Sequence, residues 1–249
     1  MKTTQLLLAF SMALSCQTLF AQTATQKVKP FLAPADEPDG YAILPQPPQP
    51  FTPEYFNDYF YYGWGKQQRT NPQRADSASF DYFHSDYIGI AECLSDAFGM
   101  KIDKESTPQI LTLLQKAIKN AKHLCDSTKD QFMRVRPFEQ FKELSLIQER
   151  KEYDKEVGTY SHPSGHTLRM FTAAYLLAEI NPTAITPIMR RALAYVENRL
   201  VCGHHYKSDI DAAIILAGTL VARLHADEGF ARQMSKAKAE YRKACKDKE

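Results

Sequence analysis

The feature that most constrains the fold is a set of apolar residues that recur at helical spacing. Those that follow Pro108 fall three or four positions apart and predict one amphipathic helix: Ile110, Leu113, Leu114, Ala117, Ile118, Ala121 and Leu124. Capping residues and stop signals predict further helices over 77–99, 164–180, 186–201 and 209–225, and a charged helix at the C-terminus. No segment alternates as a strand does, and 249 residues can bury one sizeable core. We therefore expect an all-α fold, a single-domain bundle of packed helices.

The first 21 residues are typical of a secretory signal peptide. Lys2 precedes a short apolar stretch over 6–14, and Ala21 is a small residue followed by a polar one. The apolar stretch is shorter than the roughly 20 residues that span a bilayer. We expect cleavage near Ala21 and export of the mature chain. Lipidation of Cys16 is the alternative, which is disfavoured because Ala13 stands where lipidation signals usually carry Leu.

Residues 22–75 predict an N-terminal arm ahead of a helical domain over 76–249. The centre of the arm, 45–50, reads Pro-Gln-Pro-Pro-Gln-Pro, which favours extended geometry and cannot continue a helix. Aromatic residues follow over 55–64. We expect them to cover the core rather than to form a substrate rim, because aromatic side chains mostly supply buried area.

Composition limits the partners. The formal net charge of +2 gives no bulk attraction to nucleic acid or to an anionic membrane, and the apolar run 210–222 is too short to span a bilayer. The cysteines left after cleavage fit no zinc spacing. We expect neither a metal nor another cofactor. Two disulfides are compatible with the four cysteines Cys93, Cys125, Cys202 and Cys245, and buried free thiols are the alternative for Cys93 and Cys202, which lie in apolar surroundings.

Three segments carry residues suited to binding a phosphoryl group. They are K-D-Q-F-M-R-V-R-P over 129–137, P-S-G-H over 163–166, and R-L-V-C-G-H-H-Y-K-S-D over 199–209. Lys129, Arg136 and Arg199 supply cations for the charged oxygens of such a group without a metal. Ser164 and Gly165 open a predicted helix, where free backbone N–H groups favour an anion and glycine permits a close approach.

The same segments supply a nucleophile and an acid. His205 and Asp209 are four residues apart, so on a helical turn they lie on one face. A carboxylate that holds one ring N–H leaves the other nitrogen of His205 free to attack phosphorus. His166, when protonated, could donate to the leaving oxygen as general acid and then activate water.

The order K-x6-R-P, P-S-G-H and R-x5-H-x3-D resembles the type 2 phosphatidic acid phosphatase (PAP2) superfamily. That superfamily includes lipid phosphatases, vanadium haloperoxidases and bacterial class A nonspecific acid phosphatases. The chain is similar to the class A enzymes in further runs, and its signal peptide and residues 139–160 match least. These runs are Ile43-Leu44-Pro45, Ala97-Phe98-Gly99, Thr107-Pro108, 133–138, 178–182 and Cys202-Gly203.

The resemblance implies a periplasmic or secreted nonspecific acid phosphatase that acts on small phosphomonoesters through a phosphohistidine, without metal. The substrates it implies are nucleotides, aryl phosphates and sugar phosphates, and a homo-oligomer is compatible with it. It implies that His205 is the nucleophile, Asp209 its partner and His166 the acid. The phosphate ligands it implies are Lys129, Arg136, Ser164, Gly165 and Arg199.

Two positions depart from the pattern of the family. Asn198 stands where the family usually has Ser, and His162 where class A members usually have Tyr. We expect Asn198 to alter the surroundings of the site without loss of activity, and we expect His162 to border the pocket. The spacing selects His205 over His204, to which we assign no required role.

Two other functions use similar motifs. A vanadate-dependent haloperoxidase would hold vanadate in the same pocket, but the modest length and the class A runs argue against it. A non-catalytic phosphate-binding protein would not need His166, His205 and Asp209 in these roles.

Overall fold

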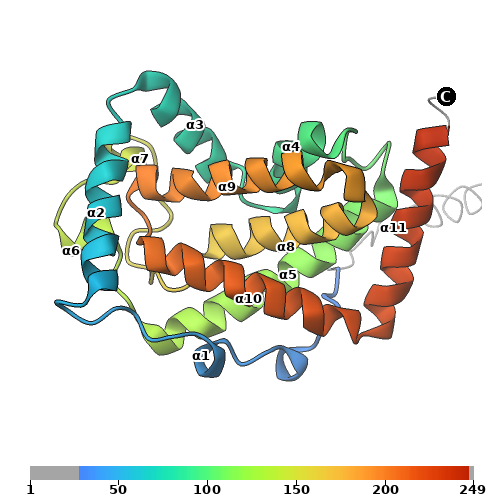
Figure 1. Cartoon of the computed structure of the whole chain (residues 1–249), viewed down its shortest axis with the longest axis horizontal. Coiled ribbons are helices and arrows are strands. Elements are labelled where there is room, and N and C mark those ends of the chain that lie inside the picture. Colours follow the sequence, from blue (N-terminus) through green and yellow to red (C-terminus); the bar gives the residue numbers. More distant parts are fainter. Residues whose placement is uncertain (1–27, 247–249) are drawn as a thin grey trace, which may run out of the picture.

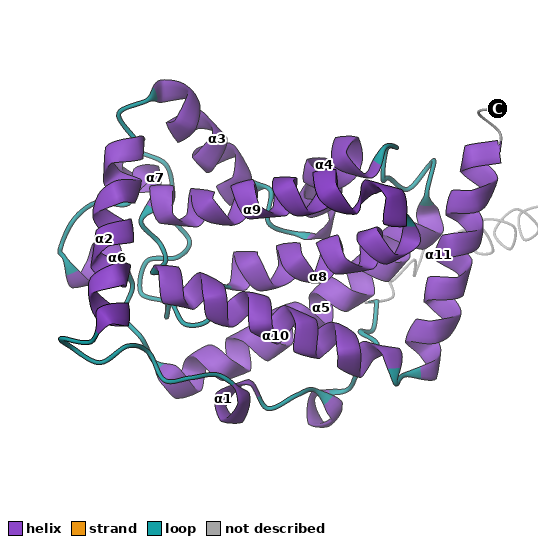
Figure 2. Cartoon of the chain, viewed as in Figure 1, coloured by secondary structure: helices purple, strands orange, loops and turns teal. Residues whose placement is uncertain are grey.

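A computed structural model of the chain describes residues 28–246, and all regular structure in this part is helical (Figures 1 and 2). The predicted signal peptide and its cleavage site at Ala21 lie outside the described residues. Four long helices form the centre of the bundle: α5 (Pro108–Phe132), α8 (Gly165–Ile180), α9 (Ile185–Cys202) and α10 (Lys207–His225). The others are α1 (Gly40–Ile43), α2 (Pro53–Gln68), α3 (Pro72–Phe83), α4 (Tyr87–Phe98), α6 (Pro137–Gln140), α7 (Leu146–Glu149) and α11 (Glu228–Lys246). Two short 3-10 helices, η1 (Pro34–Asp36) and η2 (Pro182–Ala184), complete the described part. The predicted all-α bundle is confirmed.

Helix α8 is the axis of the bundle. It packs against α5, α9 and α10, and its side chains are buried on nearly every side (Figure 1). A helix that is apolar all round is stable only inside a protein, which is why this segment lies at the centre. The position of α8 fixes its N-terminus, and therefore the P-S-G-H segment, deep in the molecule.

The predicted ends of the long helices agree with their caps. The Ser164 side chain accepts a hydrogen bond from Thr167 N and caps α8, while Pro182 follows its last residue closely. Gly99 ends α4 and Gly203 ends α9, and both adopt positive φ, at 87° and 78°. Glycine adopts this backbone conformation without steric cost, so these two residues stop their helices sharply.

The prediction of a single helix over 77–99 is wrong, because the structure has two helices there. Asn71 caps α3 and Asp86 caps α4, each through its side chain, in place of the cap expected at Asp76-Ser77. The chain bends between the helices so tightly that Gly89 lies against the backbone of His84. A Cβ on Gly89 would lie 2.6 Å from His84 Cα, which makes glycine necessary at this approach.

The aromatic segment 55–64 is part of α2, a helix that the sequence analysis did not predict. It stands across the end of the bundle and packs against α9 (Figure 1). Tyr62 is buried and Trp64 packs against the core, as expected for core cover, whereas Phe56 and Phe60 are exposed. The periodicity was obscured because α2 is aromatic on its solvent side as well as on its core side.

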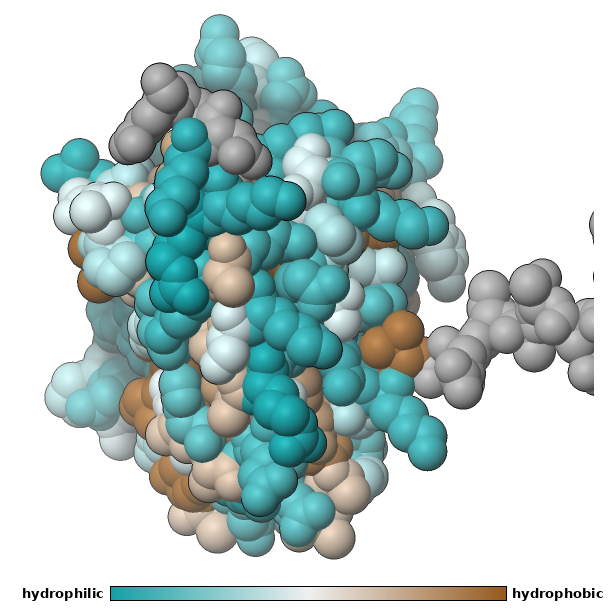
Figure 3. Space-filling model, turned by 90° about the vertical axis from the view of Figure 1, so that its right-hand side faces the viewer, coloured by the Kyte–Doolittle hydropathy of each residue, from teal (hydrophilic) through white to brown (hydrophobic). Residues whose placement is uncertain are grey.

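The surface at one end of the molecule is mainly polar (Figure 3). The face at the α11 end carries mostly hydrophilic side chains, with apolar ones scattered among them (Figure 3). Among residues 28–246, none of the helices has the length and apolar character needed to cross a bilayer. The four described cysteines are free thiols, so the structure has no disulfide among them.

Candidate active site

The predicted site residues gather at the end of the bundle where the central helices begin or end. Lys129 lies in the last turn of α5, and Ser164 and His166 lie at the start of α8. Arg199 lies in the last turn of α9, and Asp209 in the first turn of α10. Packing of these helices therefore brings together segments that are far apart in the sequence.

His205 lies in the link between α9 and α10 and faces Asp209, with 3.6 Å between Nδ1 and Oδ2. The expected helical turn is wrong, because α9 ends at Cys202 and α10 begins only at Lys207. The other ring nitrogen, Nε2, lies 3.1 Å from Nη1 of Arg136. A guanidinium can only donate, so Nε2 is the acceptor and the ring proton of neutral His205 is on Nδ1, facing Asp209.

The Asp209 carboxylate is held by other partners besides His205. Arg134 Nη1 lies 2.6 Å from Oδ1, His162 Nδ1 lies 3.1 Å from the same oxygen, and Tyr206 N donates to Oδ2 at 2.9 Å. Burial alone would raise the pKa of Asp209, but Arg134 and His162 outweigh it and hold the pKa well below its usual range. Asp209 is thus a rigid anion behind His205.

Two of these partners were outside the predicted site. Arg134 lies within the first motif, in the run M-R-V-R-P, but its spacing gave no reason to select it over Arg136. His162 had drawn attention only as a departure from the family pattern, and it borders a second cavity rather than the main one. Its contact with Asp209 nevertheless places His162 beside the pair formed by His205 and Asp209.

His205 is neutral in mild acid. It is fully buried, and this burial, followed by the nearby Arg136 charge, lowers its pKa from 6.5 to about 3. Both effects disfavour the imidazolium. The Nε2 lone pair therefore stays available well below neutral pH.

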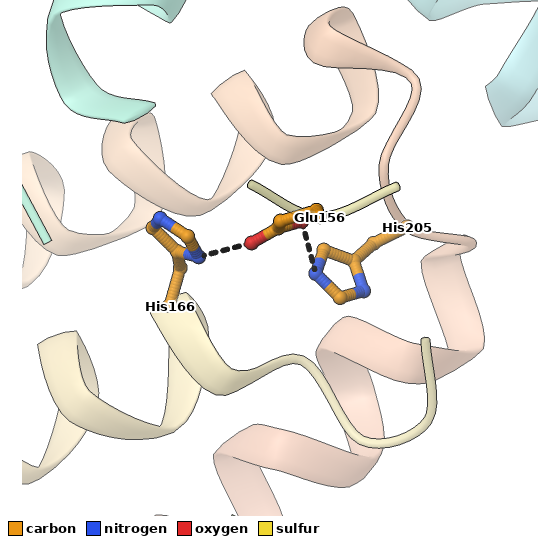
Figure 4. A group of neighbouring side chains, drawn as sticks. All are labelled: Glu156, His166 and His205. Atoms are coloured by element: carbon orange, nitrogen blue, oxygen red, sulfur yellow. Dashed lines mark ion pairs between the residues drawn. The ribbon is translucent and has the colours of Figure 1, made fainter. Parts of the chain in front are cut away.

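His166 contacts two acceptors. Its Nε2 lies 3.2 Å from the Tyr82 carbonyl oxygen, and its Nδ1 lies 3.1 Å from Oε1 of Glu156 (Figure 4). Burial and the Arg199 guanidinium lower the pKa of His166 well below 6.5, although Glu156 acts in the opposite direction. A neighbouring anion is therefore what favours a proton on this histidine.

The predicted cations surround the same space. Arg136 and Arg199 are buried, and Arg199 Nε and Nη1 have no hydrogen-bond partner among residues 28–246. Lys129 donates to the Tyr160 carbonyl oxygen, and burial followed by the charge of Arg136 lowers its pKa to about 8. Buried donors without partners are costly unless an anion satisfies them.

Ser164 and Gly165 form the start of α8. The Ser164 hydroxyl is fully buried and contacts Thr167 Oγ1 at 2.9 Å. A Cβ on Gly165 would lie 3.2 Å from Cys125 Sγ, so glycine here also lets α8 approach α5 closely. The sequence analysis had assigned Gly165 only to the approach of an anion.

A cavity of about 460 Å³ opens onto this group of residues. Lys129, Arg136, His166 and Glu156 line it, and Lys119, Lys122, Lys155 and Arg169 add positive charge further out. Of the described residues that line it, none belongs to the aromatic segment 55–64. The cavity is thus strongly cationic, as a phosphate ester requires.

Comparison with known proteins bears on the same residues. The model of the PAP2 superfamily matches residues 111–231, a range that contains all three motifs. A non-specific acid phosphatase of Providencia stuartii is 36% identical over 211 residues, which cover 84% of this chain and 83% of that protein. The chain belongs to the PAP2 superfamily.

Two further relatives are also named acid phosphatases. A non-specific acid phosphatase of Salmonella typhimurium is 28% identical over 222 residues, which cover 88% of this chain and 86% of that protein. An acid phosphatase of Zymomonas mobilis is 32% identical over 160 residues, or 63% of this chain and 60% of its own length. The predicted resemblance to nonspecific acid phosphatases of the PAP2 superfamily is confirmed.

Glu156 lies at the centre of this PAP2 site and was missed by the sequence analysis. Its Oε2 lies 2.7 Å from Arg136 Nη1 and 3.8 Å from His205 Nε2, and its Oε1 faces His166 (Figure 4). It belongs to the segment 139–160, which matched the family least. No motif or spacing pointed to it.

His204 also has a defined environment in the PAP2 site, although no role was assigned to it. Its Nε2 lies 2.7 Å from Oδ2 of Asp154, and both residues are buried. Asp154 also accepts hydrogen bonds from Tyr82 Oη at 3.0 Å and from Ser145 Oγ. His204 thus fastens the segment that carries Glu156 to the end of α9.

Three residues of the site could in principle hold a metal ion. Ligand atoms of Glu156, His166 and His205 lie within 4.8 Å of one another, and two histidines with a carboxylate are a set that zinc accepts. Arg136, however, lies 2.7 Å from the Glu156 carboxylate and 3.1 Å from His205 Nε2. Positive charge at this place suits an anion better than a cation, and a metal-free PAP2 site stays our prediction.

Asn198, the departure from the family pattern beside Arg199, points away from the cavity. Its side-chain amide donates to Asp81 Oδ2 at 2.7 Å, and Arg74 donates to its oxygen. These contacts tie α9 to α3, so Asn198 acts on the packing that supports Arg199.

Proposed function

We propose that this chain is an acid phosphatase that hydrolyses phosphate monoesters through a phosphohistidine on His205. The observation that carries the proposal is the pair of contacts made by this ring: Arg136 faces Nε2 at 3.1 Å, and Asp209 faces Nδ1. They favour the tautomer whose lone pair points among the phosphate-binding cations. The names of the relatives, non-specific acid phosphatase and acid phosphatase, support the same reaction.

In the first half-reaction, His205 Nε2 attacks phosphorus and the ester P–O bond breaks. Lys129, Arg136 and Arg199 balance the charge of the phosphoryl oxygens, together with Ser164 and the free N–H groups at Gly165. His166 lines the cavity, and it donates a proton to the leaving oxygen.

In the second half-reaction, water attacks the phosphohistidine. His166, now neutral, takes a proton from the water, and the P–N bond breaks to release inorganic phosphate and neutral His205. Asp209 stabilises the positive charge that develops on His205 while phosphorus is attached. Every proton is exchanged between substrate, water and side chains of this chain.

The cavity supports small substrates with a single phosphate ester. About 460 Å³ accommodates a nucleotide, an aryl phosphate or a sugar phosphate. Export to the periplasm or the medium, cleavage near Ala21, the division into 22–75 and 76–249, and a homo-oligomer remain proposals from the sequence.

The test is release of phosphate from an aryl phosphate at pH 5 to 6 with excess chelator. We expect turnover by the mature chain, and its loss in His205→Ala. His123→Ala, which changes a half-exposed histidine on α5, is the matched control and should keep full activity. No turnover from folded wild-type protein would contradict the proposal, and vanadate-dependent halide oxidation would then identify a haloperoxidase.

A further inference from the structure

Glu156 takes up the space in which a phosphoryl group would bind. In-line attack requires phosphorus about 3–3.5 Å from the attacking nitrogen, with its oxygens on the cations. Glu156 Oε2 already lies 3.8 Å from His205 Nε2 and 2.7 Å from Arg136 Nη1. A carboxylate and a phosphoryl group therefore cannot occupy this position together, both because of their volume and because of their like charge.

Glu156 also separates the cavity from the nucleophile. The residues that line the cavity include Glu156, His166 and Arg136, but not His205 or Arg199, both of which are fully buried. Figure 4 shows the carboxylate between the two histidine rings. A substrate in the cavity reaches His205 only after this side chain has moved.

The contacts of Glu156 suit a group that can be displaced. Its Oε2 makes no hydrogen bond of good geometry among the described residues, so charge alone holds it against Arg136. The fixed point of the segment is instead Asp154, which is held by His204, Tyr82 and Ser145. The Glu156 side chain can therefore rotate away while its backbone stays anchored.

The burial pattern of the segment is the reverse of the usual one. Asp154 and Glu156 point inward, whereas Tyr153 and Val157 are 85% and 49% exposed. Acidic residues are rarely buried unless they pair with charge. The inward carboxylates are therefore held by the cationic site.

We propose that Glu156 is an internal competitor for the phosphoryl position, which the phosphate of a substrate must displace before His205 can react. The inference rests on the proposed phosphatase function for the identity of the displacing group. Protonation does not remove the competitor, because Arg136 and His166 overcome the effect of burial and hold the pKa of Glu156 well below its usual range. Displacement is therefore the route that stays open at acidic pH.

The position of Glu156 also bears on the protonation of His166. In the resting state the Glu156 carboxylate is the anion beside His166 Nδ1. A phosphate anion in the same place supplies negative charge of the same sign, so exchange of one anion for the other keeps the influence that raises the pKa of His166. Glu156 thus imitates the substrate in charge and in place.

The first test is the affinity of the mature chain for inorganic phosphate at pH 6, measured by calorimetry. We expect Glu156→Gln and Glu156→Ala to bind phosphate about tenfold more tightly or better, within the range usual for coupled sites. Glu152→Gln, an exposed residue of the same segment, is the control and should bind as wild type does. Equal or weaker binding by both Glu156 variants would overturn the proposal.

Turnover separates this proposal from the proposed function. Removing a competitor should lower KM for an aryl phosphate in the Glu156 variants. If Glu156 instead assisted His166, its variants would have a lower kcat without a lower KM. This result would also overturn the proposal. If no variant and no wild-type protein turned over while phosphate binding still tightened, the competitor would stand and the phosphatase function would fail.

A structure of the wild-type chain with inorganic phosphate gives a test that does not depend on how the variants fold. We expect phosphate on Arg136 and Arg199, with the Glu156 carboxylate beyond ion-pair distance of Arg136. Phosphate bound elsewhere, with Glu156 still in contact with Arg136, would contradict displacement.

Discussion

The Asp209 carboxylate, fully buried behind His205, belongs to a charged network. Arg134 joins this carboxylate to Asp58 on α2, with 2.6 Å to Asp209 and 2.7 Å to Asp58. The motif residues were predictable because their chemistry and spacing mark them. Arg134, His162 and Glu156 were not, because their roles come from contacts between segments that only the packed fold brings together.

Loss of Arg134 should impair chemistry more than substrate binding. Arg134→Gln leaves Asp209 less firmly placed behind His205, and a misplaced group of this kind costs about a hundredfold in rate. We expect kcat to fall on this scale with little change in KM. Arg150→Gln removes an exposed pair with Asp76 and is the control. Unchanged kcat in folded Arg134→Gln would show that Asp209 does not need it.

The pH dependence of kcat should follow His166. His205 has a pKa of about 3, so it stays neutral above about pH 4 and imposes no acidic limit there. His166 must carry a proton, and its pKa is lowered, so activity should fall as pH rises and this proton is lost. A kcat profile from pH 4 to 8 measures this. Activity that stays flat to alkaline pH would argue against His166 as the acid.

At the scale of the helices, the break between α3 and α4 contributes to the site. Because α3 ends at Phe83, the Tyr82 carbonyl has no partner within the helix and can contact His166 Nε2 at 3.2 Å. The sequence contained a signal for this break, since Ser85 and Asp86 are helix-capping types. The sequence analysis used Asp76-Ser77 as the cap instead, and in the structure the close approach of Gly89 to His84 accompanies the break.

Two glycines test this account of the break. Gly89→Ala places a Cβ 2.6 Å from His84 Cα, so we expect a loss of about 1–3 kcal/mol in the free energy of unfolding. Gly63→Ala in α2 meets no atom within 4 Å and should stabilise by about 0.5–1 kcal/mol. Urea unfolding measures both. A neutral Gly89→Ala would mean that the bend is not tightly packed.

At the scale of the whole molecule, the fold was predictable because α5 and α8 to α11 have clear ends or apolar periodicity. Helix α2 and the segment that carries Glu156 were not, since both are held by contacts distant in the sequence. Burial of the site makes the stability of the folded chain sensitive to acid. Burial lowers the pKa of His166, His204 and His205 in the folded state, whereas they titrate near 6.5 when unfolded.

Stability should therefore decrease as pH falls below about 6.5. In that range the unfolded chain binds more protons at these histidines, and each contributes a loss on the order of 1 kcal/mol per pH unit. The carboxylates of Asp209 and Glu156, whose pKa values are lowered, add a loss at still lower pH. Urea unfolding at pH 4 to 7 measures this. A chain that became more stable on acidification would contradict these pKa directions.

Helix α11 closes the bundle at the end opposite the site (Figure 1). Its Glu240 accepts hydrogen bonds from Gln109 N and Ile110 N, at the first turn of α5, while Lys129 lies at the last turn of that helix. At the usual helical rise, Ile110 and Lys129 are about 28 Å apart. A linker, tag or solid support joined to the end of α11 would thus be attached at the end of the bundle opposite Lys129 and the start of α8, which makes this the natural point for fixing the enzyme to a surface.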